Sequence, residues 1–488
     1  MNYDRLIRQR NLKHFARYYR LILFSVVVAV MVIVGSLVIG DSVRATLRHQ
    51  VEERLGRAES VIFARQSLLE EEVLQHPLLA DARAYMLVEG FLSYEGRMLP
   101  VMVWGADVEQ AMINEPLQEE LGGMPADDIV LRLPATGMVP SGSLFVTENY
   151  TTSLRVAIAG VTSAEEGGNM NLRNEQIRPL NIFIPRQTLA QTMEREGKIN
   201  LILADNLLTR EQWGEVWQPR LSGLKIVGST DFSEVTSSRI FLQEQVVESL
   251  CESKEANRLY SYLANDIATQ QDTIPYSFVT AMDSYRGEPL QENDIILSDY
   301  SARRLRTKVG DRVDISYFVA EEMKNLSTKW QQLRVKAIVP IEELEADSGL
   351  SAEFPGLSDV ERCTEWDSDL PIDMERIKDE DEDYWYRYRQ TPKPIIPYAL
   401  LKQDWARDYG TATALRIKGD IDTTHLTPEM FGVDIFHPRE GALYAANNGV
   451  DFSSLFLALG FFIVAAALML MYAPLWEMYS ERTREFDT

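Results

Sequence analysis

The sequence predicts an α+β protein in which a large mixed domain lies between two membrane-spanning helices. Two long uncharged stretches near the ends of the chain predict the helices. Between them, short β-branched or alternating runs are separated by Gly, Pro, Asn and Asp and are interspersed with helical patterns, which is typical of mixed sheets. The net charge of −24 is concentrated in this central part and indicates a water-exposed domain.

The first uncharged stretch, Leu21–Gly40, has 20 residues and the second, Phe452–Trp476, has 25. A helix needs about 20 apolar residues to cross a hydrocarbon core of roughly 30 Å, so both stretches can span a bilayer. A cleavable signal peptide is the alternative for the first stretch, but its apolar region is too long and no small-x-small cleavage site follows it. We therefore expect transmembrane helices over 21–40 and 452–476.

The charges at the two ends predict the orientation. Residues 1–20 carry +5 and residues 477–488 carry −2, so the remainder carries −27. Because basic flanks stay in the cytoplasm, we expect the N-terminus there, and the second span returns the C-terminus to the same side. The domain over 57–450 is then extracytoplasmic. Its acidity excludes nucleic acid as a partner held by bulk electrostatics.

The segments that flank the spans are predicted to be helical. Residues 1–20 are expected to form a basic amphipathic helix on the membrane, or simply a basic flank that fixes the topology. Residues 41–56 are expected to continue the first span outward as a stalk with an apolar residue at every fourth position: Val43, Leu47, Val51 and Leu55. Gly56 is expected to end the stalk, because glycine tolerates a left-handed C-cap. Residues 477–488 are expected to begin a cytoplasmic coupling element.

The interior of the domain gives three further expectations. A long helix is predicted within residues 233–270. The stretches "NEPLQEELG" (114–122) and "GEPLQENDI" (287–295) open comparable passages, which indicates two similar subdomains. Residues 354–409 combine prolines, an acid run and an aromatic cluster, and this composition predicts an irregular segment.

No motif in the sequence indicates catalytic chemistry, and the sequence predicts a protein that is not an enzyme. The five histidines are scattered, and no H-E-x-x-H, G-x-S-x-G or G-x-x-x-x-G-K-[ST] motif occurs, so we expect no catalytic residue, metal or cofactor. The acid run Asp379–Asp383 could hold calcium, but without a turn glycine it is better interpreted as a solvated loop. Cys251 and Cys363 are compatible with one disulfide or with two buried thiols.

Three passages resemble a known family. "GDSVRATLRHQVEERLG" after the first span, "DIILSDYSARRLRTKVGDRVDIS" with its Gly310-Asp311 turn, and "MYSERTREFDT" after the second span are similar to ABC-transporter permeases of the MacB/FtsX/lipoprotein-release type. In that family the tail continues as R-x-x-E-x-G, and Arg482, Arg484, Glu485 and Phe486 match its opening positions. The order of these passages along the chain agrees with the family throughout.

The resemblance implies a permease subunit in the bacterial cytoplasmic (inner) membrane that transmits movement and binds a separate ABC ATPase subunit. It also implies pairing with a second copy or a paralogue, and an extracytoplasmic partner protein or a lipoprotein or peptide substrate. Contacts with the ATPase are expected from both ends of the chain: Arg5, Arg8, Arg10, Glu481, Arg482, Arg484, Glu485 and Phe486.

Family members carry four spans, whereas this chain has two, so we expect the C-terminal spans to be missing. The alternative is a two-span extracytoplasmic sensor with a trimmed cytoplasmic output domain. A signalling module directly after Thr488 would favour the sensor, and further hydrophobic segments would favour the permease.

Overall fold

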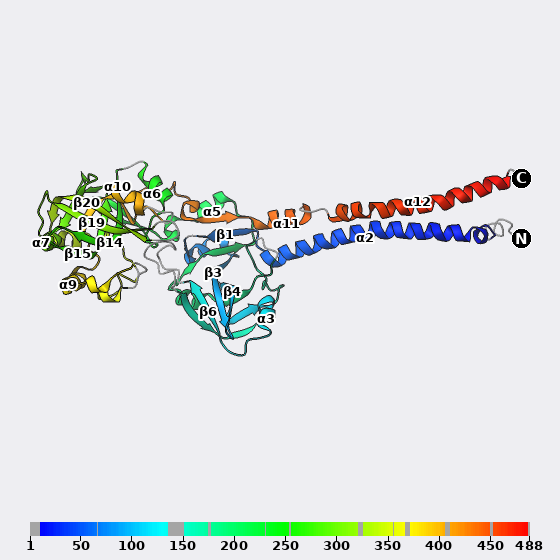
Figure 1. The fold of residues 1–488 in the computed structure, drawn as a ribbon, viewed down its shortest axis with the longest axis horizontal. Coiled ribbons are helices and arrows are strands. Elements are labelled where there is room, and N and C mark those ends of the chain that lie inside the picture. Colours follow the sequence, from blue (N-terminus) through cyan, green and yellow to red (C-terminus); the bar gives the residue numbers. More distant parts are fainter. Residues whose placement is uncertain are drawn as a thin grey trace. The chain divides into compact units, whose positions relative to one another are not determined.

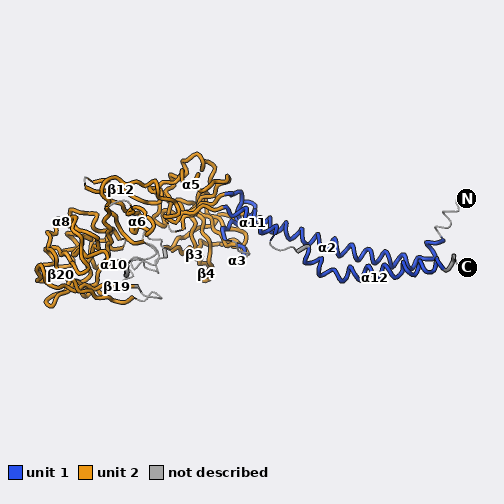
Figure 2. The backbone as a smooth tube through the Cα atoms, turned by 90° about the horizontal axis from the view of Figure 1, so that it is seen from above, with its two compact units in different colours: residues 1–59, 163–178, 437–488 blue, residues 60–162, 179–436 orange. Residues whose placement is uncertain are grey.

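The computed structural model confirms the α+β class. It describes residues 10–486 except 66, 135–150, 174–176, 230, 253–254, 321–325, 355, 367–370, 406–409 and 449–451. The chain divides into a helical unit, formed by residues 1–59, 163–178 and 437–488, and a sheet unit, formed by residues 60–162 and 179–436 (Figure 2). Each unit is described by itself below.

The helical unit is built on a long antiparallel helix pair. Helix α2 (Ala16–Leu55) runs unbroken through the stretches predicted as first span and stalk, and α12 (Phe452–Phe486) lies alongside it (Figure 1). Residues 10–14 are also helical, and two backbone hydrogen bonds carry the helix across Phe15. Gly56 ends α2 with a φ of +56°, a conformation that glycine adopts without strain. Helix α11 (Pro438–Asn448) packs on the outer part of α2 through Val51, Leu55 and Ala446.

The sheet unit contains a first barrel. Strand β3 pairs with β4 and β6, β4 with β9, β9 with β5, and β5 with β8. Strands β7 and β8 are separated only by Ala157, and β7 pairs with β6, so a single kinked strand closes the ring. The strands are β3 (Arg83–Tyr94), β4 (Arg97–Ala106), β5 (Ala111–Asn114), β6 (Ile129–Pro134), β7 (Thr151–Val156), β8 (Ile158–Thr162) and β9 (Asn181–Pro185).

A second barrel follows in the same unit. Strand β14 pairs with β15 and β19, β15 with β21, β21 with β18, β18 with β20, and β20 with β19, which closes the ring. Its interior is filled by a large apolar core. The strands are β14 (Ala256–Ala268), β15 (Thr273–Met282), β18 (Asp294–Ser298), β19 (Arg312–Ala320), β20 (Leu326–Val339) and β21 (Pro394–Pro397).

The two barrels share one topology. Each begins with an antiparallel hairpin, and each has the same parallel and antiparallel neighbours in the same chain order. Helix α3 (Glu115–Leu121) of the first corresponds to α7 (Asp299–Leu305) of the second, and α4 (Arg186–Thr192) corresponds to α10 (Tyr398–Trp405). The N-caps Asn114 and Ser298 are therefore equivalent. The sequence predicted two similar subdomains from passages that align 114 with 287, but these positions are not equivalent in the two barrels.

Further strands extend both sheets. Strands β11 (Leu201–Ala204), β1 (Ser60–Ala64) and β23 (Val433–Phe436) continue the first sheet beyond β3, and β22 (Ala414–Ile417), β13 (Ser233–Ser237) and β12 (Leu224–Gly228) extend the second beyond β14. These extensions share one apolar core with α5 (Arg210–Val216) and α6 (Glu244–Cys251). The short elements are β2 (Leu69–Glu70), β10 (Lys198–Ile199), β16 (Ser284–Tyr285), β17 (Glu288–Pro289) and α8 (Ile341–Ala346).

Two sequence-based expectations are wrong. The long helix within 233–270 is instead β13, α6 and β14, because β14 is buried on both faces and therefore lacks the alternation that identifies a strand. The segment 354–409 is not irregular throughout, since it contains α9 (Asp379–Tyr388), β21 and α10. The acid run forms the first turn of α9, where the helix dipole favours negative charge.

Candidate functional site

The interface between α2 and α12 is lined by small residues. Ser25, Ser36 and Gly40 are buried on α2, and each serine hydroxyl donates to a carbonyl one turn earlier in its own helix. On α12, Gly460 lies so close to Val32 that a Cβ added there would be 2.5 Å from a methyl carbon of the valine. Small residues that allow such close approach are typical of helix pairs in membranes.

The remaining faces of the pair are exposed and apolar. Among the described residues, α2 and Ser454–Glu481 of α12 are the segments long and apolar enough to cross a membrane, and only 11% of each apolar window is buried. A core helix of a soluble protein would be mostly buried. The helices therefore present apolar side chains to their surroundings, as lipid-facing helices do.

One end of the pair carries exposed aromatic side chains. Tyr472, Trp476 and Tyr479 follow one face of α12, with the first two rings stacked at 6.1 Å. On α2, the side chain of Tyr18 hydrogen-bonds to Glu477, which brings the first turns of α2 beside the last turns of α12. Tyr and Trp are enriched where a membrane meets water, so this end has the composition of a membrane interface.

The predicted coupling residues lie at this end of the pair. Arg10 is exposed, and Glu481 is half-buried on α12. Arg5 and Arg8 lie outside the described residues. The backbone of α12 continues to Phe486, but the side chains of its last turn are not described: Arg482, Arg484, Glu485 and Phe486. The structure thus brings the two predicted segments to one end and leaves their contacts untested.

The opposite end of α2 is held by a polar network inside the helical unit. The backbone N–H of Asn171 donates to the carbonyl of Arg54 at 3.0 Å, and the Arg54 guanidinium donates to the carbonyl of Arg173 at 3.0 Å. Asn169 donates to the carboxylate of Glu53 at 3.4 Å. Arg439 donates to the carbonyl of Gly56. Loop 163–173 and α11 therefore each satisfy one carbonyl that the C-terminus of α2 leaves unpaired.

Helices α2 and α11 lead into neighbouring strands through short connections. Residues 56–59 join α2 to β1, and His437 alone separates β23 from α11. Strands β1 and β23 are hydrogen-bonded antiparallel partners, with Val61 opposite Phe436 at the point where both chains leave the sheet.

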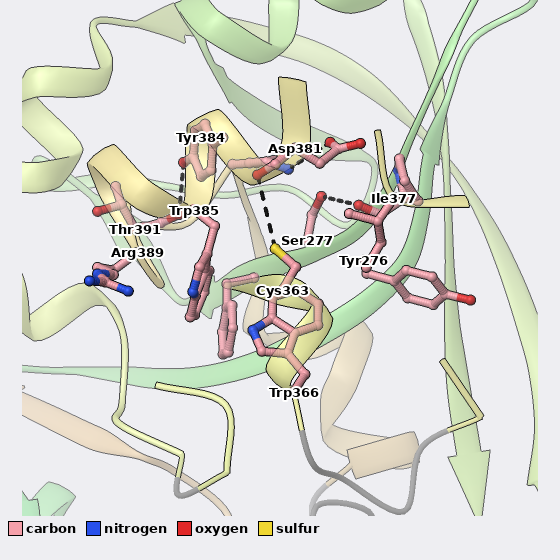
Figure 3. A pocket seen from close by; sticks show the side chains of 13 residues that line it. Tyr276, Ser277, Cys363, Trp366, Ile377, Asp381, Tyr384, Trp385, Arg389 and Thr391 are labelled. Atoms are coloured by element: carbon pink, nitrogen blue, oxygen red, sulfur yellow. Dashed lines mark hydrogen bonds and ion pairs between the residues drawn. The ribbon is translucent and has the colours of Figure 1, made fainter. Parts of the chain in front are cut away.

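A buried ionic cluster lies in the second barrel, and Figure 3 shows one of its members, Asp381, beside Cys363. The carboxylate of Asp381 pairs with the Arg304 guanidinium, with one nitrogen–oxygen distance of 3.1 Å, and with the Lys393 ammonium at 3.6 Å. All three side chains are at most 7% exposed. The Lys393 nitrogen also lies 4.5 Å from the centre of the Tyr384 ring. These contacts join α7, α9 and β21 in the barrel wall.

Burial shifts the pKa of two groups in this cluster. It lowers the pKa of Lys393 to about 8, and the attraction of Asp381 only partly opposes this effect. Burial also raises the pKa of the Cys363 thiol to about 12, and Glu382 adds to that rise. Cys363 and Cys251 are free, which excludes a disulfide between them in this structure. A thiol with so high a pKa is a poor nucleophile.

The space at the cluster is too small for a substrate. The cavity lined by Cys363, Trp366, Asp381 and Lys393 measures about 10 Å³, which is roughly the room needed by one water molecule. Within the described parts of the chain, no group of three or more His, Cys, Asp or Glu side chains is placed to hold a metal ion. The arrangement fits a structural ionic cluster better than an acid–base site.

Sequence reasoning missed this cluster because its members are far apart in the chain. Asp381 was interpreted as part of a solvated loop, although it is 5% exposed, and Arg304 lies 77 residues away. Lys393 was not singled out. Its position between a proline and the apolar strand β21 was the available signal, since a lysine so placed is carried into the core.

Comparisons with known proteins add little. No protein-family model and no curated protein matches the sequence. Among solved structures, the chain is similar to the periplasmic region of MacB from Actinobacillus actinomycetemcomitans, with 10% identity and a TM-score of 0.21 over 42% of this chain and 83% of that one. At that TM-score the likeness carries no functional argument, so the proposals below rest on the residues of this chain.

Proposed function

We propose that the chain is the membrane subunit of an ABC-type permease, in which movement of two transmembrane helices is transmitted to the extracytoplasmic barrels. The continuity between helices and strands carries this proposal. The α2 and α11 helices each reach the first sheet through at most four residues, and they enter adjacent strands. Because hydrogen-bonded strands move together, a tilt or sliding of α2 and α11 would be passed on to the sheet through β1 and β23.

The orientation and partners of the proposal follow from charge and from the family resemblance. The basic first 20 residues place both helix ends in the cytoplasm of a bacterium, where an ABC ATPase subunit would contact Arg10 and the tail from Glu481 to Phe486. A second copy or a paralogue would complete the permease. An outer partner protein, or a lipoprotein or peptide, would engage the barrels.

A reversible lock between the helices tests this function. The Cβ of Val32 lies 4.0 Å from the Cβ position at Gly460, which suits a disulfide. We expect the oxidised V32C/G460C protein, reconstituted in membranes with the ATPase that co-purifies with it, to lose stimulation of ATP hydrolysis. Reduction should restore the stimulation. Val32→Cys alone is the matched control and should respond to neither treatment.

The outcomes separate the competing functions. Unchanged stimulation in the locked protein would refute transmission through the helix pair. Reversing Arg482 and Arg484 together to glutamate should lower the stimulation while the ectodomain keeps its near-UV circular dichroism, if the tail contacts the ATPase. Co-purification of a signalling kinase instead of an ABC ATPase would favour the two-span sensor.

A further inference from the structure

A stripe of free basic side chains follows one face of the first helix. Arg10, Lys13, Arg17 and Arg20 are spaced by three, four and three residues, which places them on the same side of a helix, and all four are exposed. Among the described residues, none of the four forms an ion pair with a carboxylate. The Arg20 guanidinium donates a hydrogen bond to the backbone carbonyl of Ala16. Within the part of the chain that the structure describes, these four exposed cations therefore have no carboxylate partner.

The stripe is continuous with the apolar face of the span. Seven residues bring a helix back to nearly the same side, so Arg10 and Arg17 are followed on one line by Phe24, Met31 and Val38. These three apolar side chains are 64%, 65% and 60% exposed. The outward face changes from basic to apolar between Arg20 and Phe24, which is about one helical turn, or roughly 6 Å.

The stripe faces away from the other helix. The buried contact face of α2 carries Ser25, Ser36 and Gly40, and its centre lies about a third of a turn around the helix from the centre of the basic stripe. Two described carboxylates near this end of α12, Glu477 and Glu481, interact with Tyr18. The cations are therefore open to the surroundings of the helix pair rather than to α12.

We propose that this face binds anionic phospholipid, with the acyl chains along Phe24, Met31 and Val38 and the headgroup phosphates at Arg20, Arg17 and Lys13. The inference rests on the membrane-spanning role of the helices. The 20 residues of 21–40 cover about 30 Å, which is the thickness of the hydrocarbon core, and the cations begin directly outside it. The apolar side chains therefore lie at the depth of the acyl chains, and the basic side chains lie at the depth of the headgroup phosphates. Each basic residue near an anionic surface contributes about 1 kcal/mol, which is about fivefold in affinity.

The test measures which lipids surround the intact protein. The full chain is reconstituted in bilayers of phosphatidylcholine, and trace spin-labelled phosphatidylglycerol or phosphatidylcholine reports the lipids in direct contact by electron spin resonance. We expect phosphatidylglycerol to be preferred by roughly fivefold, with the preference falling as salt rises. Replacing Arg10, Lys13, Arg17 and Arg20 by Gln should reduce the ratio to about one.

Two control variants separate charge from fold. Replacing Arg10, Arg17 and Arg20 by Lys keeps the charges and should keep the preference. A second control neutralises four exposed ectodomain lysines and should not change the ratio: Lys225, Lys308, Lys402 and Lys418. A preference that survives the Gln substitutions would overturn the proposal. If replacing only Lys13, Arg17 and Arg20 by Gln leaves the preference unchanged and abolishes capture of the ATPase, the stripe is a protein contact rather than a lipid site.

The failure of this inference can be told from failure of the proposed function. If alkaline carbonate extracts the chain from membranes, the helices do not span, and both proposals fall. If the chain resists extraction and the helix lock stops ATPase stimulation, but no lipid is preferred, then only the lipid site is wrong.

Discussion

The two barrels of the sheet unit have the same strand order but differ in one connection. In the first barrel, residues 163–180 join β8 to β9, and most of this loop belongs to the helical unit, where it bonds to the end of α2. In the second barrel, residues 340–393 join β20 to β21 and pack on that barrel's own core through Phe354, Trp366 and Trp385. The two barrels thus share a topology, but the equivalent connection belongs mostly to the helical unit in the first barrel and packs on the barrel's own core in the second.

This difference indicates a division of roles between the barrels. The first connection holds the last turn of the stalk helix, so the first barrel is linked to the helices by a loop as well as through the sheet that contains β1 and β23. The second connection brings Asp381 and Cys363 into a closed core and makes its own ionic cluster with Lys393. We therefore expect the first barrel to follow the helices and the second to keep its shape.

The largest expected effect comes from the ionic cluster that only the second barrel has. Asp381→Asn leaves the Arg304 and Lys393 charges buried without their counter-charge, and breaking a buried pair costs about 3–5 kcal/mol. Urea unfolding of the full chain in detergent should show this loss in the tryptophan fluorescence, which includes Trp104 of the first barrel and Trp366 and Trp385 of the second. The matched variant in the first barrel is Glu120→Gln, whose partner Arg97 is half-exposed, and it should cost less than about 1 kcal/mol.

A second outcome would weaken the comparison. If Asp381→Asn and Glu120→Gln destabilise equally, the second barrel does not depend on its buried cluster. Adding Lys393→Met to Asp381→Asn removes one unpaired charge and should recover part of the loss. No recovery would mean that Lys393 contributes through packing rather than through its charge.

A smaller effect is expected at the equivalent helix caps. Asn114 is fully buried, accepts from the backbone N–H groups of Leu117 and Asn181, and donates to the carbonyl of Pro179. Ser298 accepts one backbone bond, from Ser301. Asn114→Ala should therefore cost about 2–3 kcal/mol and Ser298→Ala about 1 kcal/mol in the same urea unfolding experiment. A larger loss for Ser298→Ala would contradict the assignment of Asn114 as the anchor of β9.

The sequence predicts what local patterns determine. The spans follow from the length of the uncharged stretches, and strands such as β3 and β4 follow from alternation. Both are properties of neighbouring residues. The closing of each barrel depends on pairing between distant strands, as when Asp266 of β14 lies opposite Ser316 of β19. No local pattern contains that information, so the barrels themselves were not predicted.

The similarity between the two barrels could be predicted only in part from the sequence, for a related reason. Equivalent positions keep their backbone role but not their residue type: the cap is Asn114 in one barrel and Ser298 in the other, and the left-handed residue after the helix is Gly122 in one and Arg306 in the other. The identical letters "EPLQE" lie at positions that are not equivalent. The alignment was therefore wrong because it relied on a chance identity of residues. The similarity of the two barrels is found only in how their strands pair.

The smallest expected effect concerns the connections themselves. Arg54→Met removes the guanidinium that donates to the carbonyl of Arg173, so the stalk end and loop 163–173 should open more often. Losing one hydrogen bond of about 1 kcal/mol corresponds to roughly fivefold faster exchange at the Asn171 amide, which otherwise donates to the carbonyl of Arg54. Hydrogen exchange of the full chain, read by mass spectrometry, measures this change.

Arg389→Met is the matched variant in the second barrel, because its guanidinium also donates to a backbone carbonyl of its connection, that of Val360, at 2.8 Å. It should speed exchange around residues 360–366 and leave loop 163–173 unchanged. Arg54→Met should do the reverse. If either variant speeds exchange in both connections, the two barrels respond together, and the division into a barrel that follows the helices and a barrel that keeps its shape is wrong. Separate responses would mean that movement of the stalk reaches the first barrel without loosening the second.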